Sequence, residues 1–498
     1  MAYRRNKSNS KKWKESFKTQ GKLFFENSTL HGVKYVAESG RSFMERFMWF
    51  TWITIGIVTT TVIIVNLWEK FQTNPTITGL DTDFHNWDVA FPAITICQHI
   101  PTSEEKIREF IEVHQHKNKT DIADLDFYTK VAQLSINTWS QFTQSYSQQS
   151  FVDMETDMKE LVYNISNKCD DVFQTCYWKS TAYNCCDIFD FVFTEHGFCY
   201  TFNSKHYDKH FQKSADYEFK KKYIQETDLK WSLTFQVKST TSHFSIFIIN
   251  SNEITGIDFK PQHIWDFRID TILFSVKQTY TTEDTSQLNI KQRHCAFENE
   301  VKIQIDDTYS YTGCTTECRM NNAMKLCSCI PFFYTIVNKN YRHCRFDEIS
   351  CISEHLEEIK SVDKCNCHLG CLHTVYEIEK LDTLMPDEEG EGNSKLENKF
   401  VSWPMVRYKR EVLFGWVDLL VSFGGIAGLF LGFSLLSAVE ILYYFSIRVY
   451  CTTRQKRKTA SEDKFKKYNE KFLVPVPVYY NQRRLSDLVL SRMTNDNK

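Results

Sequence analysis

Two long uncharged runs of apolar residues stand near opposite ends of the chain. Phe47–Trp68 carries no charge over 22 residues, and Leu419–Val439 carries none over 21. A helix of about 20 apolar residues crosses the hydrocarbon core of a bilayer, so each run predicts a membrane-spanning helix. Tryptophans near the ends of the first run fit an interfacial aromatic belt: Trp49, Trp52 and Trp68. This run starts too late and is too long for a cleaved signal peptide, which predicts an uncleaved anchor.

The second apolar run has a pattern of small residues. Glycines lie four residues apart, at Gly424, Gly428 and Gly432. The polar break Gly432-Phe433-Ser434 interrupts the run, and Ser437 follows one turn later. Exposed backbone groups inside a span are tolerated only where they face protein or water. The pattern therefore predicts a pore-lining helix, and a packed anchor helix with a small-residue contact stripe is the alternative.

Charge places the two ends of the chain on one side of the membrane. Residues 1–46 hold eleven Lys/Arg against four Asp/Glu, and residues 447–498 hold thirteen against five. Cytoplasmic loops carry such an excess, so both ends are predicted inside and residues 69–418 outside. The predicted segments are therefore a cytoplasmic region 1–46, a first span 47–68, an external domain 69–418, a second span 419–446 and a basic tail 447–498.

The predicted external domain is acidic, with 36 basic and 52 acidic residues. Such a surface concentrates cations and repels anions, although salt screens it over about 8 Å. Ordinary solubility accounts for the same surplus.

Cysteine placement indicates an oxidising compartment for the same segment. Of seventeen cysteines, only Cys451 lies outside it. An even number of cysteines on the predicted outer side indicates up to eight disulfides, whose pairing the spacing does not give. Zinc is the alternative, but the single-residue gaps of Cys327-Ser-Cys329 and Cys365-Asn-Cys367 suit zinc poorly. The disulfide candidates are Cys97, Cys169, Cys176, Cys185, Cys186, Cys199, Cys295, Cys314, Cys318, Cys327, Cys329, Cys344, Cys351, Cys365, Cys367 and Cys371.

Local patterns in the external domain predict a mixed α and β structure. Thr102-x-x-Glu105 resembles a capping box that opens a helix. Two further helices are predicted over Cys314–Cys327 and Glu354–Lys360, and Pro386–Ser394 predicts an acidic loop. The strand candidates are Trp231–Val237, Phe244–Ile249, Thr271–Val276, Val301–Ile305 and Val375–Ile378. Two sequons predict glycans, at Asn118 and Asn164.

Motifs of soluble enzymes are missing from the sequence. It contains no HExxH, GxSxG, Walker or GxGxxG pattern, and its fifteen histidines show no metal-ligand spacing. The basic run 454–458 suits anionic lipid better than nucleic acid. No enzymatic activity, bound cofactor, resident metal or nucleic-acid partner is therefore expected.

Four groups of residues, taken in order, resemble the degenerin/epithelial sodium channel family, above all its insect pickpocket-type branch, over residues from about 24 to 447. They are Ser28-Thr-Leu-His31-Gly32 before the first span; Phe91-Pro-Ala-Ile-Thr-Ile-Cys97 after it; Gly197-Phe-Cys199-Tyr-Thr-Phe-Asn203 together with the later cysteine run; and Phe423-Gly-Gly425 with Gly432-Phe433-Ser434-Leu-Leu-Ser437 and Glu440.

The resemblance implies roles for particular residues. Gly432, Phe433 and Ser434 align with a selectivity filter, in which carbonyl and hydroxyl oxygens replace the hydration shell of a cation. His31-Gly32 matches the gating motif of the family. The implied pore and gate residues are Asp418, Val421, Ser422, Gly424, Gly425, Gly428, Ser437 and Glu440.

Four features of the sequence either leave a role open or depart from the family pattern. Glu440 fits an acid at the inner mouth of the pore, and a helix-end carboxylate in interfacial water is the alternative. Val421 occupies the degenerin position, where larger side chains are associated with an open pore. Ser422 stands where many relatives have Asp or Asn, and Cys367-His-Leu-Gly-Cys371 departs from the more usual Leu-Pro gap.

The whole pattern predicts an α+β membrane protein in which two transmembrane helices flank a large disulfide-rich ectodomain with a central β-sheet and peripheral helices. The expected function is that of a subunit of a trimeric, voltage-independent, amiloride-sensitive and sodium-selective channel in the plasma membrane, gated through its ectodomain. Homo- or heterotrimeric partners, the lipid bilayer and an extracellular ligand are implied. The alternatives are a non-conducting surface receptor and an accessory subunit of a heteromeric channel.

Overall fold

The computed structural model describes residues 2–81, 89–115, 121–146, 157–208, 223–224, 231–238, 243–266, 268–336, 339–384, 394–401, 406–455 and 459. The chain divides into two units. One combines the two ends of the chain, Met1–Phe71 and Gly415–Lys498, and the other comprises Gln72–Phe414.

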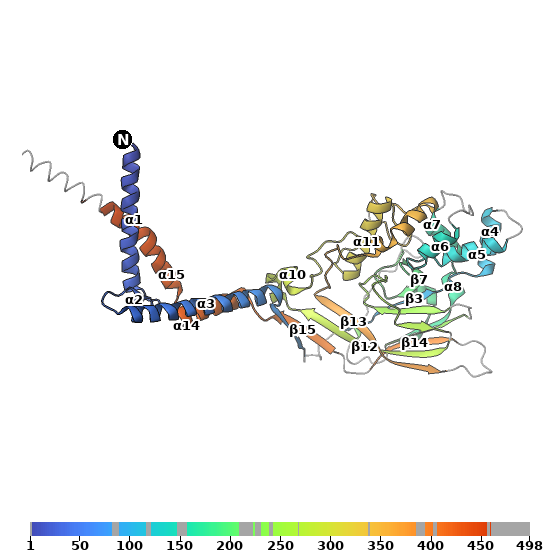
Figure 1. The fold of residues 1–498 in the computed structure, drawn as a ribbon. Helices are drawn as coiled ribbons and strands as arrows, with labels where there is room; N and C mark the ends of the chain where they lie inside the picture. Colours follow the sequence, from blue (N-terminus) through green and yellow to red (C-terminus); the bar gives the residue numbers. More distant parts are fainter. Residues whose placement is uncertain are drawn as a thin grey trace, which may run out of the picture. The chain divides into compact units, whose positions relative to one another are not determined.

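The unit built from the two ends is helical (Figure 1). Its elements are α1 (Ala2–Asn27), α2 (Val33–Ala37), α3 (Phe43–Thr73), α14 (Trp416–Leu431), α15 (Leu435–Leu442) and the π-helical turn η4 (Tyr443–Arg448). Helix α3 and the helical stretch Leu435–Gln455 are each long and apolar enough to cross a membrane, while α14 is a shorter apolar helix. The apolar window of α3 is almost entirely unburied within the chain, as expected of a helix that faces lipid or other subunits.

The start of α3 follows from its sequence. The Ser42 hydroxyl accepts a hydrogen bond from the backbone N–H of Glu45 at 3.3 Å, which satisfies one of the unpaired donors of the first turn. The Glu45 carboxylate also lies in that turn, where the helix dipole favours negative charge. The helix ends just before Asn74-Pro75, because a residue preceding proline is disfavoured in the α conformation.

Helix α1 is an element that the sequence patterns did not predict. Its second half packs against the chain that follows α15. The Phe24 ring lies 5.6 Å from the Tyr444 ring and 5.5 Å from the Phe445 ring, between centroids. The Gln20 amide donates to the Thr452 hydroxyl at 3.1 Å. The first helix is therefore anchored by aromatic contacts to the end of the chain that carries the second apolar run.

The Gln72–Phe414 unit is built on two main β-sheets. The larger has the order β1-β15-β12-β14-β9-β4-β5, with β13 also paired to β12, and the smaller has the order β11-β10-β3-β7-β6; β2 pairs with β8. The strands are β1 (Thr76–Leu80), β2 (Val89–Ala90), β3 (Ala93–Gln98), β4 (Phe173–Trp178), β5 (Thr181–Tyr183), β6 (Phe189–Thr194), β7 (Gly197–Phe202), β8 (Tyr223–Ile224), β9 (Ser232–Val237), β10 (Phe244–Ile249), β11 (His263–Trp265), β12 (Ile269–Thr281), β13 (Leu372–Leu384), β14 (Lys395–Phe400) and β15 (Val406–Val412).

Two of the sequence motifs form the centre of this unit. The segment that starts at Phe91 becomes β3, and the segment that starts at Gly197 becomes β7. The two strands pair antiparallel with Cys97 opposite Cys199, which form a disulfide. The Asn203 amide donates to the Phe91 carbonyl at 2.6 Å. The Phe91 ring is fully buried among aromatic rings of both sheets. These two motifs therefore have a structural role in the hydrophobic core.

Helices cover the sheets of this unit (Figure 1). They are α4 (Glu104–Gln115), α5 (Ile122–Ala132), α6 (Trp139–Tyr146), α7 (Met158–Ile165), α8 (Cys169–Val172), α9 (Cys185–Ile188), α10 (Ile290–Arg293), α11 (Tyr311–Cys327), α12 (Ile349–Glu354) and α13 (Leu356–Lys360), with 3₁₀ turns η2 (Glu283–Gln287) and η3 (Phe346–Glu348). A mixed fold with many disulfides and two apolar helices is thus confirmed.

Two local predictions were wrong. The Ser103 hydroxyl, and not that of Thr102, accepts from the first turn of α4, while Thr102 donates to the Ile165 carbonyl at 2.6 Å. The segment Val301–Ile305 is not a strand. The alternating pattern arises because one side of the segment is partly buried against α11. The Gln304 N–H donates to the Glu317 carboxylate of that helix at 2.7 Å.

The sixteen cysteines of this unit form eight disulfides, and Cys451 is free. Helix α11 is tied to the segment before β13 by two of them and to α12 by a third. The pairs are Cys97–Cys199, Cys169–Cys186, Cys176–Cys185, Cys295–Cys371, Cys314–Cys367, Cys318–Cys365, Cys327–Cys351 and Cys329–Cys344.

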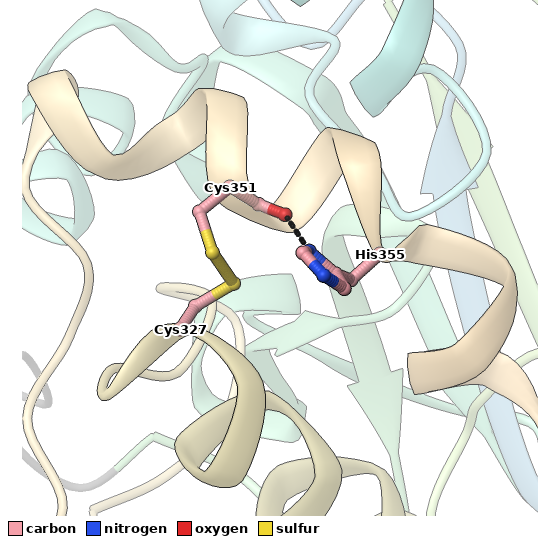
Figure 2. A group of neighbouring side chains, drawn as sticks. All are labelled: Cys327, Cys351 and His355. Atoms are coloured by element: carbon pink, nitrogen blue, oxygen red, sulfur yellow. Dashed lines mark hydrogen bonds between the residues drawn. A yellow bond between two sulfur atoms is a disulfide. The ribbon is translucent and has the colours of Figure 1, made fainter.

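One disulfide lies beside a histidine, in a grouping that resembles a metal site. Figure 2 shows the bonded sulfurs of Cys327 and Cys351 with His355 next to them. The His355 Nδ1 contacts the Cys351 carbonyl at 3.1 Å. A cysteine binds zinc as a thiolate, and a disulfide offers none, so the cysteine arrangement does not support the zinc alternative.

A buried ion cluster joins α11 to the smaller sheet. The Arg319 side chain is 1% exposed and contacts two carboxylates. Its Nε donates to Glu195 at 2.7 Å and its Nη2 donates to Asp258 at 2.6 Å. The Tyr334 hydroxyl donates to the same Glu195 carboxylate at 2.6 Å. The cluster fixes the turn between β6 and β7 against the middle of α11.

Candidate pore segment

The second apolar run is two helices separated by the predicted polar break. Helix α14 ends at Leu431, and Gly432 follows with φ +64°, in the left-handed region. The Gly432 N–H donates to the Gly428 carbonyl at 2.9 Å, and the Phe433 N–H donates to the Ala427 carbonyl at 3.2 Å. These bonds form a left-handed helix cap, which glycine adopts without steric cost. The break is therefore encoded locally by Gly432.

Gly432 also lies directly against the predicted gating motif. The His31 N–H donates to the Leu431 carbonyl at 2.9 Å. A Cβ atom placed on Gly432 would lie 2.6 Å from His31 Cδ2, which is closer than atoms can approach. Two independent constraints, the left-handed backbone and the neighbouring imidazole, disfavour any larger residue at Gly432.

Ser434 begins the helix on the far side of the break. Its hydroxyl accepts from the Ser437 N–H at 3.2 Å, and its own N–H donates to the Ser437 hydroxyl at 3.3 Å. This reciprocal pair is a capping box in which serine takes the place of the usual Glu or Gln. The hydroxyls of Ser434 and Ser437 are 3.1 Å apart, so two hydroxyl oxygens are gathered at one point of the break.

A threonine before the gating motif reaches the same place. The Thr29 hydroxyl lies 3.4 Å from the Ser437 hydroxyl and 3.5 Å from the Glu440 carboxylate. Ser437 is 5% exposed, whereas Glu440 is half-buried. The break is therefore lined by oxygen atoms from two distant parts of the sequence, which is the kind of ligand that hard cations prefer.

Gly32 is also required by its surroundings. It has φ +78° and precedes α2, and an added Cβ would lie 3.1 Å from Ile53 in α3. Further along α3, a Cβ on Gly56 would lie 3.4 Å from Leu431 and 3.5 Å from the Phe430 carbonyl. Helices α3 and α14 therefore approach closely at Gly56, as membrane helices do at small residues.

The remaining predicted pore residues lie on α14. The Asp418 carboxylate accepts from the Gly415 N–H at 3.0 Å and so caps the start of the helix. Val421 is 67% exposed, and a Cβ on Gly424 or Gly425 would meet nothing within 4 Å in the described chain. Ser422 is half-buried. An apolar, glycine-rich side of α14 thus lacks a partner within the described part of a single chain.

The predicted glycan sites lie in the other unit. Asn164 is in α7 with a half-buried side chain, and Asn118 lies outside the described residues.

The sequence identified the filter and the gating motif as separate candidates, but it did not predict that they are in contact. It missed Thr29 and Gly56. Thr29 stands two residues before His31, and Gly56 is a small residue inside an apolar helix; both signals were present in the sequence.

The chain matches a known protein family over most of its length. The family model described as "Amiloride-sensitive sodium channel" matches residues 24–444. The chain therefore belongs to the amiloride-sensitive sodium channel family, which is a family of ion channels and not of enzymes.

Three relatives illustrate the range of similarity. "Sodium channel protein Nach" of Drosophila ananassae is 24% identical over 473 residues, covering 85% of this chain and 86% of the relative. "Pickpocket protein 28" of Drosophila melanogaster is 22% identical over 501 residues, covering 87% and 79%. The human "Bile acid-sensitive ion channel" is 23% identical over 467 residues, covering 86% of each.

Proposed function

We propose that the chain is a subunit of a trimeric, voltage-independent, amiloride-sensitive channel that conducts sodium through the break at Gly432-Phe433-Ser434. Gating is exerted through the Gln72–Phe414 unit, by a stimulus or ligand that acts on it. The proposal rests on one observation, the oxygen-lined interruption of the second apolar run. At this interruption Gly432 has a left-handed conformation and lies against His31.

Trimer formation is supported by the unpartnered side of α14. Three copies of a helix with Val421, Gly424, Gly425 and Gly428 on one side can approach an axis closely because these residues are small. Each copy would bring its own Ser434 and Glu440 toward that axis. A ring of oxygens selects cations by the size of the cavity and the strength of its ligand field.

Substitution at Ser434 tests the proposal. We expect Ser434→Ala and Ser434→Leu to change the sodium-to-potassium permeability ratio or to abolish amiloride-blocked current, while surface biotinylation shows normal delivery. Ser446→Ala is the matched control, because Ser446 is an exposed serine about three turns further along the same helical stretch. Ser434 variants with unchanged selectivity and unchanged block would favour the non-conducting receptor, and current restored only by a sister subunit would indicate an accessory role.

The proposed location is the plasma membrane, with both termini cytoplasmic and Gln72–Phe414 outside. The excess of basic residues at both ends and the eight disulfides between them support this topology. Glycan mapping should find sugar at Asn118 or Asn164 and at no asparagine of the first 46 residues. A sugar attached to Asn6 or Asn27, which also lie in sequons, would contradict the topology.

A further inference from the structure

A cavity in the Gln72–Phe414 unit is bordered by histidines. It measures about 560 Å³ and lies among the end of β3, the segment between α5 and α6, the turn between β6 and β7, and the start of β10. Among its described lining residues the ionisable side chains are His99, His196 and His243, since Cys97 is in a disulfide. No part of the proposed pore mechanism uses these imidazoles.

Two of the histidines form a cross-strand pair. Strands β3 and β10 pair antiparallel with Gln98 opposite Phe244, so His99 and His243 face each other one position beyond. The His99 N–H donates to the His243 carbonyl at 3.0 Å, and the ring centroids are 6.2 Å apart. Opposed side chains on neighbouring strands have their Cβ atoms about 4.5–5.5 Å apart, close enough for two imidazoles to reach one ion.

Each ring is held by one nitrogen. The His243 Nδ1 lies 2.5 Å from Asp266 Oδ1, and the His99 Nε2 lies 3.0 Å from the Ser245 hydroxyl. Among the described residues, the other nitrogen of each ring has no hydrogen-bond partner. A carboxylate bonded to one imidazole nitrogen fixes the tautomer and makes the other nitrogen a better metal ligand. The Asp266 carboxylate is in turn bonded by Arg268 at 3.2 Å.

The third histidine is arranged differently. The His196 Nε2 bonds to the Gly256 carbonyl at 3.0 Å, and its ring contacts the Phe247 ring at 4.6 Å between centroids, tilted by 34°. His196 is therefore part of the cavity wall.

We propose that His99 and His243 bind a divalent transition-metal ion such as Zn²⁺ at the rim of this cavity, with Asp266 orienting His243 and water completing the coordination. Two imidazole nitrogens suit Zn²⁺, whereas Ca²⁺ and Mg²⁺ require oxygen ligands. Zinc–nitrogen bonds are about 2.0–2.1 Å long, and the centroids of the two rings are 6.2 Å apart. Such an ion links the ends of β3 and β10.

The test measures metal binding on the purified full-length protein in detergent, so it does not depend on ion conduction. Isothermal titration of metal-free protein with Zn²⁺ should give one ion per chain, and Zn²⁺ should raise the temperature of unfolding. His99→Gln and His243→Gln should each abolish both effects. Asp266→Asn should weaken binding by about 10- to 100-fold, as expected for a residue that orients a ligand.

His355→Gln is the matched control, because His355 belongs to the separate grouping beside the Cys327–Cys351 disulfide. Each variant must show the unfolding temperature of the wild type without zinc, which separates loss of the site from loss of the fold. Undiminished zinc binding by His99→Gln or His243→Gln, loss of binding in His355→Gln, or absence of zinc binding by the wild type would each overturn the proposal.

Discussion

At the residue scale, the contact between Gly432 and His31 is the observation that joins the predicted filter to the predicted gating motif. The sequence motifs identify both residues, but only the folded chain places the imidazole where a Cβ of residue 432 would lie. Long-range contacts of this kind are not encoded in local spacing, so sequence reasoning could name the partners and not their contact. The same limit explains why Thr29 and Gly56 were missed.

Replacing Gly432 with alanine should destabilise the helical unit for two separable reasons. The left-handed backbone costs a non-glycine residue roughly 1–2 kcal/mol, and the clash with His31 adds to that cost. In a His31→Ala background the clash is removed, and only the cost of the left-handed backbone remains. The unfolding temperature of purified protein should therefore fall less for Gly432→Ala in that background than in the wild type.

Gly79→Ala is the control for this cycle, since a Cβ there meets nothing within 4 Å. Equal effects of Gly432→Ala in both backgrounds would show that the His31 contact does not contribute.

Glu348 gives a prediction on pH. Bidentate hydrogen bonds from Arg342, both of 2.7 Å, together with the Arg345 N–H, lower the pKa of the Glu348 carboxyl from 4.5 to about 2. A lowered pKa stabilises the folded state above the unfolded value and loses that effect as the pH falls from 4.5 toward 2. Because the Arg342 side chain is 49% exposed, Glu348→Gln should cost only about 1 kcal/mol at pH 7.

Thermal unfolding of the wild type and Glu348→Gln across this range measures the effect, and their difference should shrink between pH 5 and pH 3. Asp347→Asn serves as the control, because its pairing with Arg345 at 3.4 Å is solvent-exposed. A difference that is constant with pH would argue against the Arg342 interaction.

At the element scale, periodicity predicted strands well where a partner strand was available. The candidate Phe244–Ile249 matches β10, and Thr271–Val276 and Val375–Ile378 lie inside β12 and β13. It failed for Val301–Ile305, because alternation reports one-sided burial and does not show whether a sheet edge lies alongside. The sequence could not predict the disulfide pairing either, because sixteen cysteines allow many pairings and the three-dimensional fold decides which one forms.

Helix α11 depends on the buried ion cluster for its position against the smaller sheet. Arg319→Met should destabilise the protein by about 3–5 kcal/mol, because Glu195, which is 3% exposed, would remain buried without its cation. Adding Glu195→Gln to that variant removes this buried charge and should recover part of the loss. Denaturant unfolding of the two single variants and the double variant measures the coupling.

Additive effects in this cycle would show that Arg319 and Glu195 do not stabilise each other. Arg342→Met is a useful comparison, because the Arg342 side chain is 49% exposed and the expected loss is smaller.

At the scale of the whole molecule, the order of the motifs along the sequence predicted the mixed fold, the disulfide-rich character and the two apolar helices. The structure adds that the second apolar run is interrupted and that both chain ends contribute to one helical unit. An unpartnered side of α14 has no explanation within the described part of one chain and requires either lipid or further copies. Conduction of sodium through the break, in an assembly of several copies, is therefore the central claim.

The most direct test is the reversal potential of current carried by the wild-type protein in a voltage-clamped cell. Replacing external Na⁺ with K⁺ should shift the reversal potential of the amiloride-blocked current strongly to negative voltages, and the current should show no voltage-dependent activation. An amiloride-blocked current whose reversal potential does not move would contradict sodium selectivity. Surface-expressed protein that carries no cation current, alone or with related subunits and under any stimulus, would contradict the channel itself.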